Sequence, residues 1–250
     1  MYLHMRFSHK IKKLLSGQGL ASARKHTRRF FHRTRVPLET TRIIETIDGP
    51  NFQQIRQRYA VEDPGEDWPK YLDLERWIEI NIRRIREVEL DLTRPKRVLD
   101  LGCGAGYFLH IAQLLGHEGL GLDLDDLPMF AEITRLLGVR RVISRIEPLT
   151  PLPDLGGRFD LITAFMICFN NHKQPNLWDV PEWEFFLDDL AKYLVPRGRV
   201  WLELNREYDG TFYTPALREF FALRGGKIDE HKIIFNSDLG VPVSAFPVGR

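Results

Sequence analysis

The segment VLDLGCGAGYF, residues 98–108, constrains the fold more than any other part of this 250-residue chain. Apolar residues surround Asp100 and run directly into three glycines within five positions, followed by Tyr107. A short apolar run of this kind is typical of a strand that is buried on both faces of a parallel sheet. The glycines that follow permit positive φ and expose the backbone to a ligand. The segment therefore predicts a strand, a ligand-binding turn and a helix.

The following sequence repeats the alternation of strand and helix. Apolar strands are predicted at 97–101, 118–124, 140–144, 158–167 and 200–205, and amphipathic helices at 71–90, 107–116, 127–138, 181–195 and 214–226. Residues 227–236 are expected to add one or two strands. This order predicts an α/β fold with a doubly wound, mostly parallel, Rossmann-like sheet and an N-terminal helical extension.

The charge distribution divides the chain into three parts. Residues 1–35 contain ten Lys or Arg and no Asp or Glu, whereas the remainder is net acidic. We expect 1–35 to be a basic, flexible arm, 36–94 a helical extension or cap, and 95–250 the ligand-binding domain. The arm is compatible with an amphipathic helix on an anionic membrane surface, with a nucleic-acid or acidic protein contact, with an organelle transit peptide, or with a solvated tail.

The cysteine content restricts the chemistry. Cys103 and Cys168 are the two cysteines of the chain. Two cysteines cannot form a Cys-based structural zinc site, and they suggest a reducing compartment rather than a disulfide framework. No run of apolar residues approaches the length of a membrane span. We therefore expect a cytoplasmic protein without a metal site, with peripheral contact to the inner membrane surface through residues 1–35 as one interpretation of the arm.

The glycine turn excludes two common phosphate-binding motifs. A P-loop requires Lys and then Ser or Thr after its last glycine, where this chain has Tyr107 and Phe108. A dinucleotide-binding G-x-G-x-x-G motif that starts at Gly102 would require glycine at position 107. The pattern present is D-L-G-x-G-x-G.

This pattern resembles the first motif of the class I S-adenosylmethionine-dependent methyltransferases. The resemblance continues in GLDLDD, which places Asp123 at the end of the second strand, in RFDLITAF, and in LAKYLVPRGRVWLEL. It covers roughly residues 96–205. It implies the class I methyltransferase fold, methyltransferase activity and S-adenosylmethionine as cofactor.

The resemblance also implies a set of cofactor-binding residues: Asp100, Gly102, Cys103, Gly104, Gly106, Asp123, Leu124, Ile146 and Phe165. Asp100 would serve the methionine end of the cofactor, and Asp123 would accept hydrogen bonds from the ribose hydroxyls. Leu124 and Ile146 would form walls for the adenine. The alternatives are that Asp100 caps the turn, that Asp123 is a surface acid, and that the apolar residues belong to the core. Cys103 is interpreted as a small buried residue rather than a nucleophile.

The acceptor site is expected after the fourth strand, in CFNNHKQPNLWD. His172 is the candidate general base, because the unperturbed pKa of histidine lies near neutrality. Asn171, together with Asn170, would orient the acceptor; the alternative is a polar surface loop. Residues after the fifth strand also reach the cleft of this fold, namely Asn205, Glu207 and Tyr208. The helix at 71–90 is expected to cover the cofactor cleft or to pack on the sheet.

Three functions remain open from the sequence. The favoured hypothesis is in-line methyl transfer to a hydroxyl of a small molecule or saccharide, such as a cell-surface glycan. The second is an RNA methyltransferase that uses the basic arm to bind phosphates, although the acidic body disfavours a broad nucleic-acid surface. The third is an S-adenosylmethionine-binding protein without catalytic activity.

Overall fold

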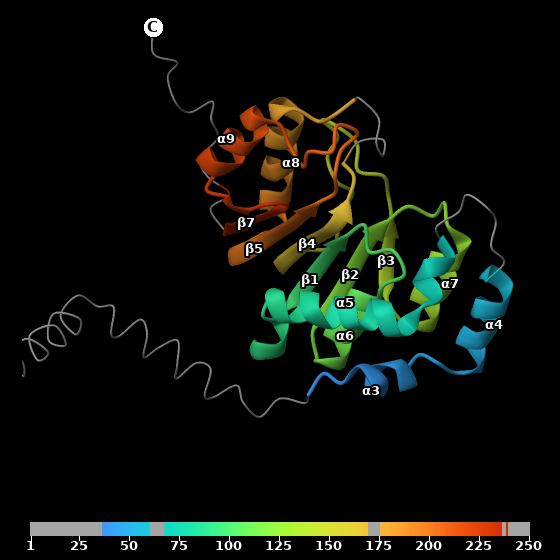
Figure 1. The fold of residues 1–250 in the computed structure, drawn as a ribbon. Helices are drawn as coiled ribbons and strands as arrows, with labels where there is room; N and C mark the ends of the chain where they lie inside the picture. Colours follow the sequence, from blue (N-terminus) through green and yellow to red (C-terminus); the bar gives the residue numbers. More distant parts are fainter. Residues whose placement is uncertain (1–36, 61–67, 170–175, 237–238, 240–250) are drawn as a thin grey trace, which may run out of the picture.

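A seven-stranded sheet with helices on both faces forms the centre of the computed structural model, which describes residues 37–60, 68–169, 176–236 and 239 (Figure 1). The basic arm, 1–35, lies outside the described residues. The strands are β1 (Arg97–Leu101), β2 (Glu118–Asp123), β3 (Arg140–Ile143), β4 (Phe159–Ile167), β5 (Leu194–Leu204), β6 (Lys227–Asp229) and β7 (Lys232–Asn236). The α-helices are α3 (Thr40–Glu45), α4 (Pro50–Tyr59), α5 (Leu74–Glu87), α6 (Tyr107–Leu114), α7 (Pro128–Leu136), α8 (Val180–Lys192) and α9 (Pro215–Leu223).

The order of the strands confirms the predicted doubly wound sheet. The order is β3-β2-β1-β4-β5-β7-β6, and β1 to β5 are parallel whereas β7 and β6 are antiparallel. The winding reverses between β1 and β4, which are neighbours in the sheet. Ligands of such sheets bind beyond the carboxyl ends of the strands at this reversal. The glycine turn that follows β1 is therefore at the expected binding position.

Each face of the sheet has its own apolar core, because strand residues alternate between the two faces. Val98, Leu161 and Trp201 belong to the cluster that includes buried residues of α5, α6 and α7. Leu99 and Ile162 belong to the cluster that includes buried residues of α8 and α9. Burial on both faces explains why β1 and β4 are almost continuously apolar in sequence.

Helix α5 is shorter than the helix predicted at 71–90. The side chain of Asp73 accepts a hydrogen bond from the backbone N–H of Arg76 and caps the helix, and residues 68–72 form a separate 3-10 helix. From that cap onward, the apolar residues fall on one face, which is buried against the sheet: Leu74, Ile78, Ile82 and Ile85. The helical period was therefore predicted correctly, and the N-cap determines where the helix starts.

The helical extension packs on the same core as one face of the sheet. Ile43 of α3 and Phe52 of α4 are buried in the cluster that contains α5 and α6. Arg58 of α4 also binds Glu132 of α7 at 2.7 Å. The extension is thus held by both apolar burial and polar contacts with the sheet-covering helices.

Strand β5 is longer than the strand predicted at 200–205, and α8 is correspondingly shorter than the helix predicted at 181–195. The backbone N–H of Phe159 donates to the carbonyl of Tyr193 at 2.7 Å, so pairing with β4 begins as soon as the helix ends. The register between β4 and β5 shifts at the Pro-Arg-Gly segment of β5, in which Arg197 has φ of +68°. No described helix has the length and apolar composition needed to cross a lipid bilayer.

Candidate active site

The glycine turn after β1 has a left-handed backbone at each of its three glycines. The φ values are +68° at Gly102, +53° at Gly104 and +78° at Gly106. The backbone N–H of Gly102 donates to the carbonyl of Leu122 at 2.7 Å, which ties the turn to β2. A Cβ at position 102 would lie 3.0 Å from Cδ1 of Ile167. Both the conformation and the close contact with β4 therefore select glycine at position 102.

Asp123 lies at the end of β2 with its carboxylate held against this turn. One carboxylate oxygen accepts a hydrogen bond from the backbone N–H of Gly104, and the other accepts one from Leu124 at 2.8 Å. Burial raises the pKa of Asp123, and the two backbone hydrogen bonds oppose that effect. The arrangement fixes an acceptor group in the position that the sequence analysis assigned to ribose binding.

A pocket of about 530 Å³ opens beside the turn. Four residues predicted for cofactor binding line it, namely Gly102, Asp123, Leu124 and Ile146. Its other walls come from three places: the segment after β3, the end of β4 with the residues that follow it, and the start of α8 with the residues that precede it. The residues are Ser144, Arg145, Glu147, Pro148, Ile167, Cys168, Phe169, Asn176, Leu177, Trp178 and Glu182. A pocket of this volume, lined by both apolar and polar side chains, is large enough for a small molecule.

Asp100 and Phe165 are placed differently from those four residues: both are buried beneath α5 and neither lines the pocket. Asp100 is 3% exposed and accepts a 2.7 Å hydrogen bond from the hydroxyl of Thr163. Burial raises the pKa of Asp100 to about 7, against the opposing effects of Thr163 and of the positive charge of Arg84. Asp100 is therefore a carboxyl group poised to change its protonation state near neutrality.

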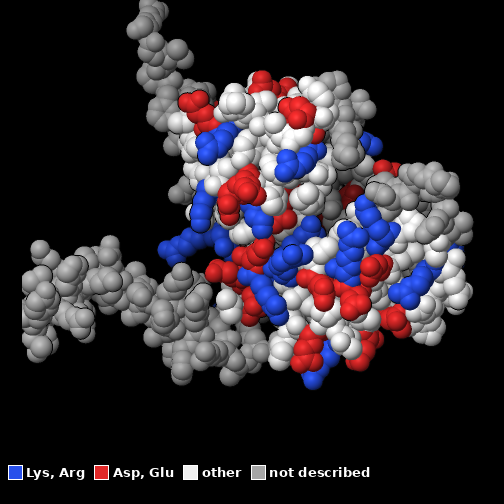
Figure 2. Space-filling model, in the orientation of Figure 1, with Lys and Arg blue, Asp and Glu red and all other residues white. Residues whose placement is uncertain are grey.

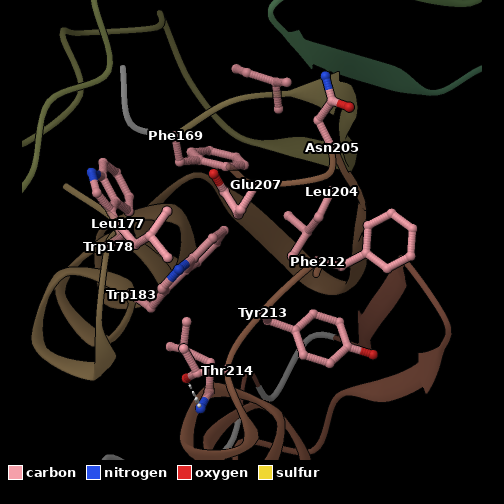
Figure 3. A pocket seen from close by; sticks show the side chains of 12 residues that line it. Phe169, Leu177, Trp178, Trp183, Leu204, Asn205, Glu207, Phe212, Tyr213 and Thr214 are labelled. Atoms are coloured by element: carbon pink, nitrogen blue, oxygen red, sulfur yellow. Dashed lines mark hydrogen bonds between the residues drawn. The ribbon is translucent and has the colours of Figure 1, made fainter. Parts of the chain in front are cut away.

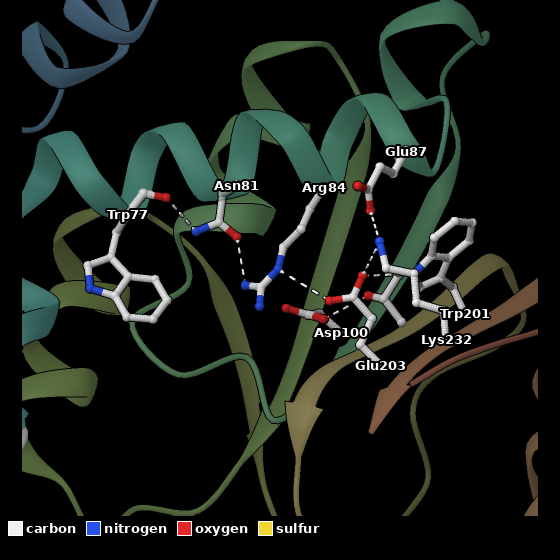
Figure 4. Close-up of polar contacts among 9 residues, drawn as sticks. Trp77, Asn81, Arg84, Glu87, Asp100, Trp201, Glu203 and Lys232 are labelled. Carbon is white, nitrogen blue, oxygen red and sulfur yellow. Dashed lines mark hydrogen bonds and ion pairs between the residues drawn. The ribbon is translucent and has the colours of Figure 1, made fainter. Parts of the chain in front are cut away.

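A charge network between α5 and the sheet lies beside Asp100, with Glu203 buried and Arg84, Lys232 and Glu87 partly exposed (Figure 4). The guanidinium of Arg84 lies 4.5 Å from the ring centroid of Phe165, and its Nε is 3.9 Å from an oxygen of Glu203. Lys232 of β7 is 3.5 Å from Glu203 and 2.6 Å from Glu87 of α5. Side chains of alternating charge thus connect α5, β5 and β7 next to the glycine turn that follows β1.

Sequence analysis missed this network, although two signals were present. Arg84 lies between the apolar positions Ile82 and Ile85 of an amphipathic helix. Glu203 interrupts the otherwise apolar strand segment VWLEL. A charged residue within a buried strand requires a partner, because an unpaired buried charge is strongly unfavourable. The position of Glu203 was thus a signal that could have indicated a cationic partner, and the structure identifies that partner as Arg84 together with Lys232.

Cys103, Gly104 and Gly106 belong to the turn but are not among the residues that line the larger pocket. The thiol of Cys103 packs on Gly121 of β2, where an added Cβ would lie 2.4 Å from the sulfur. Burial raises the pKa of the Cys103 thiol well above its usual value. A buried, protonated thiol is a packing residue rather than a nucleophile, in agreement with the interpretation from sequence.

The two catalytic candidates from sequence, Asn171 and His172, lie outside the described residues. Of the three candidates that follow β5, Asn205 and Glu207 line a second, smaller cavity of about 20 Å³. Tyr208 is 55% exposed and does not line it.

Aromatic and aliphatic side chains together form most of the wall of this smaller cavity (Figure 3). Its aromatic residues come from three segments: Phe169 after β4, Trp178 and Trp183 around the start of α8, and Phe212 and Tyr213 before α9. It shares part of its wall with the larger pocket, through Ile167, Phe169, Leu177 and Trp178. The two spaces are therefore adjacent.

Comparison with known proteins identifies the class of this protein. A family model described as a methyltransferase domain matches residues 74–227, which is more than half of the chain. The chain belongs to this family, in agreement with the resemblance to the class I S-adenosylmethionine-dependent methyltransferases. The match begins at α5, so the family domain includes the helix that contributes Arg84.

One solved structure to which the chain is similar is CalS10, an amino pentose methyltransferase from Micromonospora echinaspora. The two sequences are 29% identical, and the TM-score is 0.36. The alignment covers 56% of this chain and 51% of CalS10. A ribosomal protein L11 methylase from Lactobacillus delbrueckii subsp. bulgaricus has 19% identity, coverage of 65% and 77%, and a TM-score of 0.41. A methyltransferase from Pyrococcus furiosus has 17% identity, coverage of 66% and 85%, and a TM-score of 0.43. The chain spans about half the length of CalS10. No curated protein sequence gives a significant match.

The residues of the larger pocket fit S-adenosylmethionine, the cofactor of this class. The cofactor carries ribose hydroxyls, an adenine and a zwitterionic methionine end, and it has no phosphate. The pocket presents the carboxylate of Asp123, the apolar side chains of Leu124 and Ile146, and the bare backbone of Gly102. Among the described residues, no group of His, Cys, Asp and Glu could hold a metal ion.

Proposed function

We propose that the protein transfers a methyl group to a hydroxyl of a small-molecule or saccharide acceptor that binds next to the cofactor. The observation that carries this proposal is the extent of the larger pocket, which continues from Gly102 and Asp123 at the cofactor turn to Trp178 and Glu182 at the start of α8. A pocket of this kind can hold two small ligands side by side, as transfer between them requires.

At the end of the larger pocket near Gly102, residues of this chain would bind and orient the cofactor. Asp123 would accept hydrogen bonds from the ribose hydroxyls, and Leu124 and Ile146 would pack on the adenine. Asp100 would compensate the ammonium of the methionine end. The hydroxyl of Thr163 orients its carboxyl, and the positive charge of Arg84 favours the ionised form. The bound cofactor supplies an activated methyl group, so alignment of the acceptor oxygen contributes most of the rate.

At the acceptor end, a hydroxyl must lose its proton as the new bond forms. His172 remains our proposed general base, and Asn171 the proposed orienting group. An imidazole is suited to this role because it is largely neutral at pH 7 and can accept the proton. Both residues lie outside the described part of the chain, so their assignment rests on their position after β4.

The charges near the pocket support a small acceptor over RNA. The pocket walls include the carboxylates of Asp123, Glu147 and Glu182, and a single cationic side chain, Arg145, among the described residues. On the face seen in Figure 2, basic and acidic side chains of the described residues are interspersed rather than gathered into one basic surface. An RNA backbone requires a continuous basic surface.

We assign residues 1–35 to contact with an anionic membrane surface. Residues 36–94 are assigned to the helical extension, and residues 95–250 to the catalytic domain.

Calorimetric titration tests the cofactor site first. S-adenosylmethionine should bind the wild type and lose most of its affinity for Asp123→Ala, with Asp125→Ala as a control on the loop that follows. Release of S-adenosylhomocysteine in the presence of hydroxylated acceptors then tests catalysis. Cofactor binding without turnover on any acceptor would favour a non-catalytic binding protein, whereas turnover on RNA alone would favour the nucleic-acid alternative.

A further inference from the structure

Arg141 of β3 carries a buried guanidinium at one edge of the sheet. β3 is an edge strand that lies beside β2, and Arg141 pairs with Gly121 of β2 (Figure 1). The side chain of Arg141 is only 8% exposed, whereas that of its neighbour Arg140 is 74% exposed. A buried guanidinium is strongly unfavourable unless hydrogen bonds and an opposite charge compensate it. The groups that compensate Arg141 therefore show which part of the molecule it holds.

Both side-chain hydrogen bonds that Arg141 makes with the described residues go to the segment between β2 and α7. Its Nη1 donates to the backbone carbonyl of Leu124 at 3.1 Å, and its Nη2 donates to the carboxylate of Asp125 at 2.5 Å. A planar guanidinium holds two acceptors in a fixed relative orientation. The side chain of Asp125 is 56% exposed, and ion pairs in contact with solvent contribute little. The contact that fixes this segment is therefore the hydrogen bond to Leu124.

Leu124 is held at both of its backbone polar groups. Its N–H donates to the Asp123 carboxylate at 2.8 Å, and its carbonyl accepts from Arg141. The side chain of Leu124 lines the larger pocket, next to Asp123. Because the peptide groups on either side of Leu124 are fixed, the direction of its side chain is fixed as well. Arg141 thus acts on the wall of the pocket, although it does not line the pocket itself.

The positive charge of Arg141 also acts on Asp123. Burial raises the pKa of Asp123, and the carboxylate of Asp126 contributes to the increase. Two backbone hydrogen bonds and the charge of Arg141 oppose it. Asp100 of β1 and Cys103 of the glycine turn also interact electrostatically with Asp123, and burial raises the pKa of both. Among the described residues, Arg141 is therefore the cation that favours the ionised form of Asp123.

We propose that Arg141 is a positioning residue of the cofactor site, which holds Leu124 against the adenine through the hydrogen bond to the Leu124 carbonyl. The inference rests on the proposed function, since that proposal assigns the adenine to Leu124 and the ribose to Asp123. Arg141 itself contacts neither part of the cofactor. Its charge has a second effect, because an ionised Asp123 accepts stronger hydrogen bonds from the ribose hydroxyls.

Calorimetric titration of the full chain with two nucleosides tests this role. They are S-adenosylhomocysteine and 5′-methylthioadenosine, which contains the same adenosine without the amino acid end. Arg141→Gln should weaken the binding of both by about tenfold, because Arg141 acts on the adenosine half alone. Arg140→Gln, on the same strand, is the matched control and should bind both like the wild type, since its side chain is exposed. Asp125→Ala should stay within about threefold of wild type, because the hydrogen bond to Leu124 remains.

The pH dependence of binding separates positioning from a general contribution to the fold. Without the charge of Arg141, Asp123 takes up its proton at a higher pH. Arg141→Gln should therefore weaken binding by a larger factor at pH 5.5 than at pH 8. Arg141→Lys keeps the charge but not the planar geometry, so it should bind about threefold more weakly than wild type, with the pH profile of the wild type. If Arg141→Gln does not fold, Arg141→Lys is compared with Arg140→Lys, and equal binding by these two variants would overturn the proposal.

Three further results would overturn the role of Arg141. They are wild-type affinity in folded Arg141→Gln, weaker binding of S-adenosylhomocysteine but not of 5′-methylthioadenosine, and a loss that is equal at both pH values and is not reduced in Arg141→Lys. Titration of Asp123→Ala separates this failure from a failure of the proposed function. Nucleoside binding that depends on Asp123 and not on Arg141 rejects the inference alone, whereas a folded wild type that binds neither nucleoside rejects both.

Discussion

The hydroxyl of Thr163 donates a 2.7 Å hydrogen bond to the carboxyl group of Asp100, across the β4–β1 pairing of the sheet. This bond orients a carboxyl group that is almost completely buried and whose pKa burial raises to about 7. Arg84, above the same carboxyl, opposes the increase in pKa. Burial and the charge of Arg84 therefore act in opposite directions on the pKa of Asp100.

The stability of the protein should reflect this titration. The folded state binds the Asp100 proton more tightly than the unfolded state does, so the stability contributed by Asp100 is complete below pH ~4 and is lost as pH rises to about 7. Asp100→Asn should therefore gain stability relative to wild type by about 2–3 kcal/mol more at pH 8 than at pH 5. Urea unfolding of both proteins at the two pH values measures the difference. An equal difference at both pH values would contradict the raised pKa.

Cofactor affinity should also depend on pH. If Asp100 pairs with the ammonium of the cofactor, binding requires its ionised form, and affinity should rise between pH 6 and 8 as the carboxyl loses its proton. Asp100→Asn should bind more weakly at pH 8 and should lose this part of the dependence. Calorimetry in buffers of different ionisation enthalpy would also detect the released proton. The same pH profile in both proteins would exclude Asp100 as its source.

The affinity for the cofactor should decrease when Asp123 loses its charge. Asp123→Asn keeps one acceptor oxygen for the N–H of Gly104 or of Leu124. It would lose the charge-assisted hydrogen bonds that we propose Asp123 accepts from the ribose. We expect S-adenosylmethionine to bind about 10–100-fold more weakly, with a melting temperature near that of wild type. A large decrease in melting temperature would instead indicate that Asp123 mainly stabilises the turn.

The buried charges beneath α5 should behave as one unit. Arg84→Met removes a cation from beside Glu203 and should destabilise the protein by about 1–3 kcal/mol. Glu203→Gln removes the charge that Arg84 and Lys232 share. In the double variant the effects should be less than additive, since each single change leaves an imperfectly compensated charge. Strict additivity in a denaturant-based double-mutant cycle would show that the two residues act independently.

The two cysteines should differ in reactivity. Cys168 lines the larger pocket, whereas Cys103 is buried with its pKa raised well above the usual value. A maleimide should therefore modify the native protein at Cys168 first, and S-adenosylhomocysteine should slow that reaction. Mass spectrometry of the labelled peptides identifies the site. Rapid labelling at Cys103 in the native protein would disagree with its burial.

Local sequence patterns predicted most of the fold because the relevant forces are local. The spacing of apolar residues predicted the five parallel strands. The glycines after Leu101 predicted the turn at the point where the winding of the sheet reverses. The end of α8 and the start of β5 were predicted wrongly, because the pairing of Phe159 with Leu194 is a tertiary contact.

The candidate site could be predicted only in part. The spacing of the motifs predicted Gly102, Asp123, Leu124 and Ile146 as cofactor-binding residues. The structure places these four residues around one pocket. The network of Arg84, Glu203 and Lys232 could not be derived, since its members lie far apart in sequence and meet only after the sheet forms. The aromatic cavity escaped prediction for the same reason, although Asn205 and Glu207 were recognised as residues near the cleft.

The contact between the Cys103 sulfur and Gly121 has a consequence for evolution. A Cβ at position 121 would lie 2.4 Å from this sulfur, so the two positions share one fixed volume between β2 and the cofactor turn. A lineage can enlarge residue 121 only after residue 103 has become smaller, for example through Cys103→Gly. The order of substitution is therefore constrained, and related sequences should show these two positions changing as a pair, with small residues exchanged between them.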